Sequence, residues 1–195
     1  MWPWEHAIVG YLAYSLCSHL VYRRSPGGLE AFAVVFASVL PDIIDKPLAW
    51  EFGIFDAGYA LGHSVFMAVP LALIVGAITQ SAGRPRVGLA FGLGYLLHLP
   101  GDVLDTYFRG GQIRFDILLW PVKTVESAGT SPGFVNEFRR LFGQYLARLL
   151  AGELPAYRWA QLGLLGIAAL VWLYDGAPVV RECLRGCVRI VTSGR

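Results

Sequence analysis

The sequence predicts an all-α membrane protein, and its composition, its hydropathy and the spacing of its apolar segments together predict this fold. Hydrophobic residues make up 55% of the 195 residues and charged residues only 15%, whereas about 25% of the residues of a soluble domain are charged. The mean hydropathy is +0.52. A soluble domain of this length needs more polar surface, so we expect residues 1–195 to form a single polytopic membrane domain.

Five apolar segments are long enough, or nearly so, to be transmembrane helices. They cover residues 6–22, 29–45, 59–80, 87–105 and 157–174. A helix needs about 20 residues to cross about 30 Å of hydrocarbon, and several of these segments are slightly short. We predict a transmembrane helix bundle of about five spans, with the first four, in residues 1–105, forming a four-helix core.

A long connection, residues 106–156, precedes the fifth helix and the basic C-terminal tail, residues 157–195. Residues 117–121 are apolar but too few to cross the bilayer, and are expected to be re-entrant or interfacial. Residues 134–150 carry apolar side chains at helical spacing. They predict an amphipathic helix that lies on the bilayer or packs on the protein itself. We expect both segments to flank the entrance of a site and to admit a lipid chain.

Basic residues in the short loops predict how the chain is oriented in the membrane. Arg23 and Arg24 follow the first segment, and Arg84 and Arg86 follow the third. An up-and-down path puts these loops on one side, which the positive-inside rule makes cytoplasmic. The long connection then faces outward although it contains several arginines, which conflicts with the rule, but long loops obey it less strictly.

Charge and cysteine content argue against several other functions. The net charge of +2 is small, and no basic stripe indicates binding to nucleic acid. Cys17, Cys183 and Cys187 form neither a zinc-type pair nor a disulfide framework. Residues 1–6 lack the basic start of a signal peptide, so we expect the first apolar segment to be retained as a membrane helix.

Ionisable residues gather at one end of the predicted helices. Such residues are costly inside a membrane, and those that occur there usually have a function. Odd segments run inward and even segments outward, so the starts of segments one and three lie level with the ends of two and four. That level carries seven candidates: His6, Asp42, Asp45, His63, His98, Asp102 and Asp105. The fourth histidine, His19, lies at the other end of the first segment and is expected to be an ordinary interfacial residue.

Spacing and residue type together predict a metal site at the extracytoplasmic face. Asp42 and Asp45 are three residues apart and His98 and Asp102 are four apart, which puts each pair on one helix face. Imidazole and carboxylate ligands suit zinc, with manganese or iron as alternatives, as one ion or a pair. We assign His6, Asp42, His63, His98 and Asp102 as metal ligands, and Asp45 and Asp105 as catalytic residues that orient ligands or act as a general base.

Each candidate also has a simpler explanation. His6 is also compatible with an interfacial position beside two tryptophans, and Asp42 with the end of a helix after Pro41, although we favour the metal site for both. Asp45 has Lys46 as a potential ion-pair partner. His63 stands where a helix is expected to begin.

The motifs around these residues resemble those of the YdjM-like family of membrane-bound, metal-dependent hydrolases, which includes a LexA-regulated inner-membrane protein. The matching features are His6 in the first helix, Pro41-Asp42 at the end of the second, Gly62-His63-Ser64 at the start of the third, and His98 with Asp102 in the fourth. The resemblance covers roughly residues 1–122 and implies a metal-dependent hydrolase in the membrane. The family often has a further histidine shortly before the position of His63, where this chain has Gly58, which leaves the number of metal ions open.

The ligand set is also similar to that of zinc phospholipase C and related nucleases. We therefore expect hydrolysis of a lipid phosphoester by a metal-activated water, in a multi-pass cell-membrane protein whose partners are membrane lipid and a small-molecule or lipid substrate. A divalent-metal transporter is the first alternative, and a non-catalytic membrane protein with a structural metal is the second. The substrate, the identity of the metal and the oligomeric state do not follow from the sequence.

Overall fold

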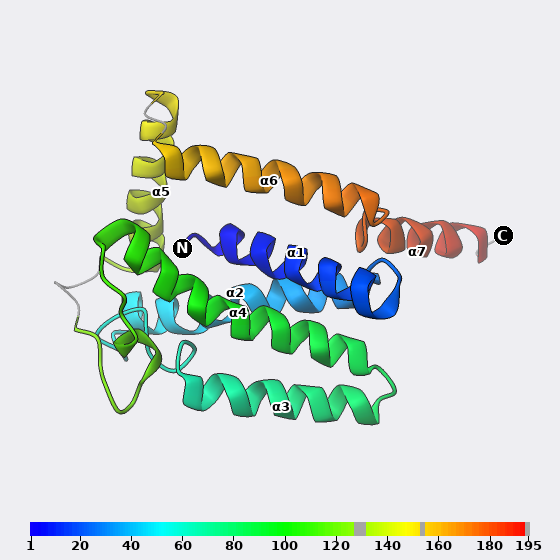
Figure 1. Cartoon of the computed structure of the whole chain (residues 1–195), viewed down its shortest axis with the longest axis horizontal. Helices are drawn as coiled ribbons and strands as arrows, with labels where there is room; N and C mark the ends of the chain where they lie inside the picture. The colour runs from blue at the N-terminus through cyan, green and yellow to red at the C-terminus, as the bar shows by residue number, and fades with distance from the viewer. Residues whose placement is uncertain (127–131, 153–154, 194–195) are drawn as a thin grey trace.

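The computed structural model describes residues 1–126, 132–152 and 155–193, and over these residues the regular structure is entirely helical, as predicted (Figure 1). The helices are α1 (Pro3–Tyr22), α2 (Gly28–Trp50), α3 (Val65–Ser81), α4 (Pro85–Gly110), α5 (Phe134–Leu150), α6 (Ala156–Tyr174) and α7 (Val180–Ser193), with a turn of 3₁₀-helix, η1 (Asp116–Leu118).

Five helices lie alongside one another and a sixth crosses their ends. α2 packs against both α1 and α4, α3 packs against α4, and α6 packs against α1. α5 runs across the end of the bundle at which the N-terminus lies, whereas α7 extends beyond the opposite end (Figure 1). The predicted amphipathic helix over residues 134–150 is α5, with the same bounds and no buried residue. Phe142 and Tyr145 of α5 pack against the ring of Trp2, and a position of α5 on the bilayer stays a prediction.

The third helix begins later than predicted. We expected it to start near Tyr59, but α3 starts at Val65. The backbone N–H groups of Ala60, Gly62 and His63 all donate to the carboxylate of Asp45, so residues 59–64 are held as a loop and not as a helical turn. The side chain of Ser64 then caps the helix by accepting a hydrogen bond from Phe66 N at 3.2 Å.

Membrane spans are only partly established by helix length and hydropathy. Among the described helices, α4 over Pro85–Phe108 and α6 over Ala156–Tyr174 are long and apolar enough to cross a membrane, and α3 is apolar but has only 17 residues. Only 6% of the apolar window of α6 is buried within the protein, as expected for a helix that faces lipid. Five spans therefore remain a prediction.

A tightly packed core lies directly beneath the polar end of the bundle. Tyr14, Val34 and Tyr95, from α1, α2 and α4, have no exposed surface. Glycine allows this close approach, because a Cβ added to Gly94 would lie 2.4 Å from the carbonyl oxygen of Val34. The packing of α4 on α2 therefore fixes the relative positions of the polar residues at the ends of these two helices.

Candidate metal centre

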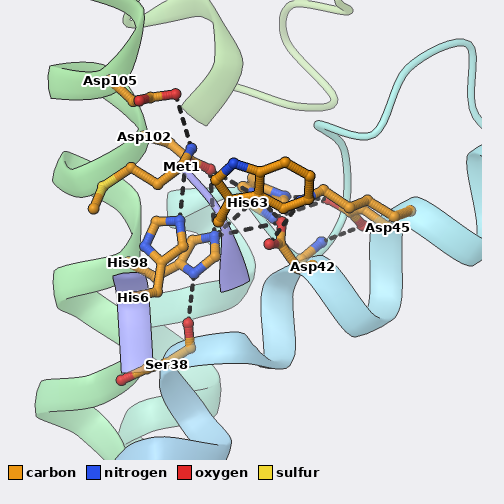
Figure 2. A network of polar contacts seen from close by, with 12 residues as sticks. Met1, His6, Ser38, Asp42, Asp45, His63, His98, Asp102 and Asp105 are labelled. Atoms are coloured by element: carbon orange, nitrogen blue, oxygen red, sulfur yellow. Dashed lines mark hydrogen bonds and ion pairs between the residues drawn. The ribbon is translucent and has the colours of Figure 1, made fainter. Parts of the chain in front are cut away.

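Helix ends from four parts of the chain bring the predicted polar residues together (Figure 2). α1 and α3 begin, and α2 and α4 end, at the same end of the bundle (Figure 1). The residues that meet there are His6, Asp42, Asp45, His63, His98, Asp102 and Asp105, all of them buried. The convergence predicted from an up-and-down path is confirmed.

Four of these side chains form a compact group of possible metal ligands. Asp42, His63, His98 and Asp102 each offer one atom, and these atoms lie within 4.8 Å of one another. His63 Nε2 lies 3.1 Å from His98 Nε2, 3.2 Å from Asp102 Oδ2 and 3.4 Å from Asp42 Oδ1. Four ligands at zinc bond lengths of about 2.0–2.1 Å stand about 3.3 Å apart in a tetrahedron. The three separations from His63 Nε2 agree with this value, and His98 Nε2 lies somewhat farther, 3.8 Å, from Asp42 Oδ1.

Hydrogen bonds to the far nitrogens of both imidazoles turn their Nε2 atoms toward the group. His98 Nδ1 lies 2.7 Å from the carbonyl oxygen of Ser38, which can only accept, so in the neutral ring Nδ1 carries the hydrogen and Nε2 is free of it. His63 Nδ1 lies 2.7 Å from Asp45 Oδ2. In that tautomer two lone pairs face each other at 3.1 Å, an arrangement that a shared cation stabilises.

Asp42 provides a second indication of a cation. Both of its carboxylate oxygens are buried and accept no hydrogen bond from the described residues. Lys46 Nζ lies 2.7 Å from Asp42 Oδ2 and pairs with it by charge, without the direction of a hydrogen bond. A buried carboxylate is costly unless it is paired or coordinates a metal. The residues of the group therefore fit a divalent metal ion.

Asp45 occupies a supporting position. Its carboxylate accepts hydrogen bonds from three backbone N–H groups and lies against His63 Nδ1, so both oxygens are engaged. A carboxylate behind the imidazole of a ligand fixes the ring and raises its basicity. Of the two roles expected for Asp45, these contacts support the orientation of a ligand, and its action as a general base stays a prediction.

His6 and Asp105 lie beside the four-ligand group without belonging to it. The ring of His6 stacks on that of His98 with 3.7 Å between centroids, and its Nε2 lies 3.1 Å from Asp102 Oδ1. Asp105 Oδ2 accepts from the amino group of Met1 at 2.9 Å, and the same amino group donates to Asp102 Oδ1 at 2.8 Å. Asp102 thus links the other three ligands to His6, Met1 and Asp105 (Figure 2).

Three residues next to Asp105 were missed in the sequence. Glu5 is only 4% exposed and accepts hydrogen bonds from Tyr157 Oη at 2.9 Å and from the side chain of Gln161. Glu5 could have been identified from the sequence, because a charge within the first turn of an apolar helix is costly in a membrane. Nothing in the sequence indicates that Tyr157 and Gln161 face α1.

A cavity of about 520 Å³ borders the group on its outer side. Its polar lining includes Asp42, Lys46 and Asp105. Its apolar lining includes Trp2, Ile43, Trp50 and, from α5, Phe134, Phe138 and Leu141. α5 therefore flanks the cavity as expected. Residues 117–121, which we expected beside the entrance, are not in this lining; the carbonyl oxygen of Trp120 instead accepts from Ser64 Oγ at 2.5 Å, at the start of α3.

No curated protein and no solved structure matches the chain. Residues 1–180 match the family described as YdjM inner membrane protein, which extends the resemblance beyond residue 122. The match includes all the helices that build the polar cluster, and the membrane location of the family agrees with the two long apolar helices α4 and α6. The chain therefore belongs to the YdjM inner membrane protein family.

Proposed function

We propose that this protein is a membrane-bound, metal-dependent hydrolase of a lipid phosphoester. The observation that carries the proposal is that Asp42 belongs both to the four-ligand group and to the wall of the 520 Å³ cavity. Structural metal sites are closed by protein ligands, whereas catalytic sites keep one side open to a substrate or to water. Because the group reaches a cavity at the end of the bundle, a catalytic role is favoured over a structural one.

Asp42, His63, His98 and Asp102 would hold the metal. Two imidazoles and two carboxylates suit zinc, and manganese or iron would also accept this set. When bound, such an ion would supply Lewis-acid activation of water and of a phosphoryl oxygen.

Residues on the cavity wall would bind and orient the substrate. Lys46 is partly buried there and would pair with an anionic phosphate oxygen, in addition to its contact with Asp42. Asp105, on the wall at the opposite side, is placed to accept a proton close to the ligand Asp102. Trp2 and Trp50 provide the amphipathic rings that gather at the headgroup level of a bilayer.

Transport of a divalent metal is less well supported. A transit path would need polar groups that continue from the cluster toward the opposite face. Directly beneath the cluster, the fully buried side chains of Tyr14, Val34 and Tyr95 fill the space between α1, α2 and α4. With this packing, the polar region ends at the cluster, and these side chains leave no open path through the bundle below it.

The test is hydrolysis by the full chain in lipid nanodiscs loaded with zinc, manganese or iron. Phospholipids and a soluble chromogenic phosphodiester serve as substrates. We expect metal-dependent release of the leaving group, lost in Asp42→Asn and His98→Ala and retained in Asp56→Asn, which changes an exposed carboxylate outside the cluster. A protein that keeps stoichiometric metal but cleaves no phosphoester with any of the three ions would refute the proposal and favour a structural metal.

A further inference from the structure

A second cavity, of about 320 Å³, lies on the other side of the cluster between α1, α4 and α6. Met1 and Asp105 line both cavities, so the two meet beside the metal centre. The apolar walls of the second cavity are Val9, Leu97, Leu104, Phe108 and Leu164. We call this second cavity the lateral groove.

The lateral groove runs from the metal centre toward the middle of the bundle. Along α4 it extends from Asp105 back to Leu97, and along α6 from Tyr157 to Leu164. At 1.5 Å per residue, each wall covers about 10–12 Å. α4 and α6 are the two helices that are long and apolar enough to cross a membrane. A groove between them therefore opens sideways into hydrocarbon.

The first cavity leads in the other direction, toward water. Its lining includes Lys46 and Glu126, together with Phe134, Phe138 and Leu141 of α5. Both cavities have apolar walls, but they differ in where their charged residues lie. Lys46 and Glu126 line the first cavity, whereas the carboxylates of the lateral groove, Glu5 and Asp105, lie at its outer end.

Hydrogen bonds fix the spacing of α1, α4 and α6 at the outer end of the lateral groove. Tyr157 Oη contacts Glu5 Oε1 at 2.9 Å and Asp105 Oδ1 at 3.1 Å, and Gln161 donates to the same oxygen of Glu5. These contacts tie α6 to both α1 and α4 beside the metal centre. Below them the walls are apolar, so the groove is preformed for a hydrocarbon chain.

We propose that the lateral groove binds the hydrocarbon chain of the substrate while the phosphate lies in the first cavity. This inference rests on the proposed function and narrows its substrate to an amphiphile in which a phosphoester joins a hydrocarbon chain to a polar group. Hydrolysis consumes one water: its oxygen forms a new bond to phosphorus, the bond from phosphorus to the leaving oxygen breaks, and that oxygen takes a proton. The apolar product returns to the bilayer along α4 and α6, and the polar product leaves under α5.

The test measures how the affinity for non-hydrolysable alkylphosphonates depends on chain length. Methyl-, butyl-, hexyl- and octylphosphonate are titrated against the zinc-loaded full chain in nanodiscs, with partition into empty nanodiscs subtracted. Each methylene buried from water strengthens binding by about fourfold. We expect affinity to rise with chain length in the native protein.

Two leucines of α4 provide a matched pair of variants. Leu104 lines the lateral groove, whereas Leu96 is outside it, and their exposed fractions are 54% and 41%. Leu104→Trp should fill the groove and abolish the rise in affinity, with methylphosphonate binding unchanged. Leu96→Trp should preserve the rise. The metal content of both variants verifies that the centre is intact.

Three other outcomes are informative. If Phe138→Trp in the first cavity abolishes the chain-length dependence and Leu104→Trp does not, the chain lies under α5 and the inference is overturned, while the proposed function stands. Equal affinity for all four phosphonates in the native protein would also overturn it. A chain-length dependence that Leu104→Trp removes, in a protein that cleaves no phosphoester, would support the groove and refute only the hydrolase.

Discussion

The two ends of the bundle each contain a buried aspartate beside a histidine, and they differ in how its oxygens are satisfied. Asp175, at the end of α6, is 1% exposed and accepts hydrogen bonds from Tyr11 Oη and Ser15 Oγ at 2.7 Å each. His19 Nε2 lies 2.7 Å from its other oxygen. At the opposite end, Asp42 accepts no hydrogen bond from the described residues.

The difference distinguishes a structural hydrogen-bond network, at Asp175, from a candidate cation site, at Asp42. Donors around Asp175 balance its charge and tie α6 to α1, which is sufficient reason for a buried carboxylate. The group at Asp42 consists of acceptors: carboxylate oxygens and imidazole nitrogens turned inward. Such a set of acceptors is stabilised by a cation, and Lys46 supplies one positive charge beside Asp42. His19, which we expected to be an ordinary interfacial residue, belongs to the hydrogen-bond network at Asp175.

Loss of a ligand should have the largest effect. His98→Ala and Asp102→Ala each remove one of four donors, and we expect each to weaken metal binding by more than about 100-fold, beyond the usual effect of a supporting residue. Competition with a chelator, combined with elemental analysis of the purified protein, measures the affinity. Asp175→Ala is the control and should keep its metal. Full occupancy in both ligand variants would abolish the distinction between the two ends.

Asp45→Asn should have the next largest effect. The substitution weakens the contact that fixes His63 Nδ1 and disturbs the loop whose N–H groups bind the carboxylate. We expect metal affinity to fall by about 10–100-fold, since this is the range for residues that orient a ligand. Asp56→Asn, in the neighbouring exposed loop, should leave the affinity unchanged. A variant with native affinity would show that His63 is oriented by packing alone.

Asp45 also shows which parts of the site could be predicted from sequence. The order and approximate positions of the helices, although not the start of α3, followed from apolar runs interrupted by arginine, glycine and proline, so the predicted level at which the polar residues meet was correct. Asp42 and Asp45 are three residues apart on one helix, and spacing alone does not decide which of them faces the group. That choice depends on the N–H groups of residues 60–63, which fold back over Asp45.

The position of His6 relative to the four ligands could likewise not be predicted from the sequence. Gly101 leaves room for its ring, since an added Cβ there would lie 3.2 Å from His6 Nδ1. How far α1 slides along α4 then decides whether His6 joins the ligands or stacks behind His98. Contacts of this kind join residues about a hundred positions apart, and local periodicity carries no information about them.

Asp175→Ala should affect stability rather than metal binding. The variant leaves the buried donors Tyr11 Oη and Ser15 Oγ without their acceptor, and we expect it to cost about 1–2 kcal/mol of unfolding free energy. Unfolding by denaturing detergent, followed by helical circular dichroism, measures the loss. Tyr11→Phe, which removes a donor together with its hydrogen bond, should cost less. A large drop in metal affinity would mean that the two ends are coupled through α1.

Glu182→Gln should have the smallest effect and tests the contact between the C-terminal helix and the bundle. The carboxylate of Glu182, on α7, accepts the N–H of Gly28 at 2.6 Å, at the start of α2. Gly28 is suited to this contact, because an added Cβ would lie 2.0 Å from Glu182 Oε2. A negative charge at a helix N-terminus stabilises it by about 0.3–1 kcal/mol at low ionic strength. Glutamine keeps the shape but not the charge, so the variant should unfold more easily in dilute buffer and regain most of the difference in high salt, where the charge is screened. Because Glu182 lies at the same end as Asp175, metal affinity should be unchanged at either salt concentration. A deficit that is equal at both would mean that the hydrogen bond, and not the helix dipole, holds α7 in place.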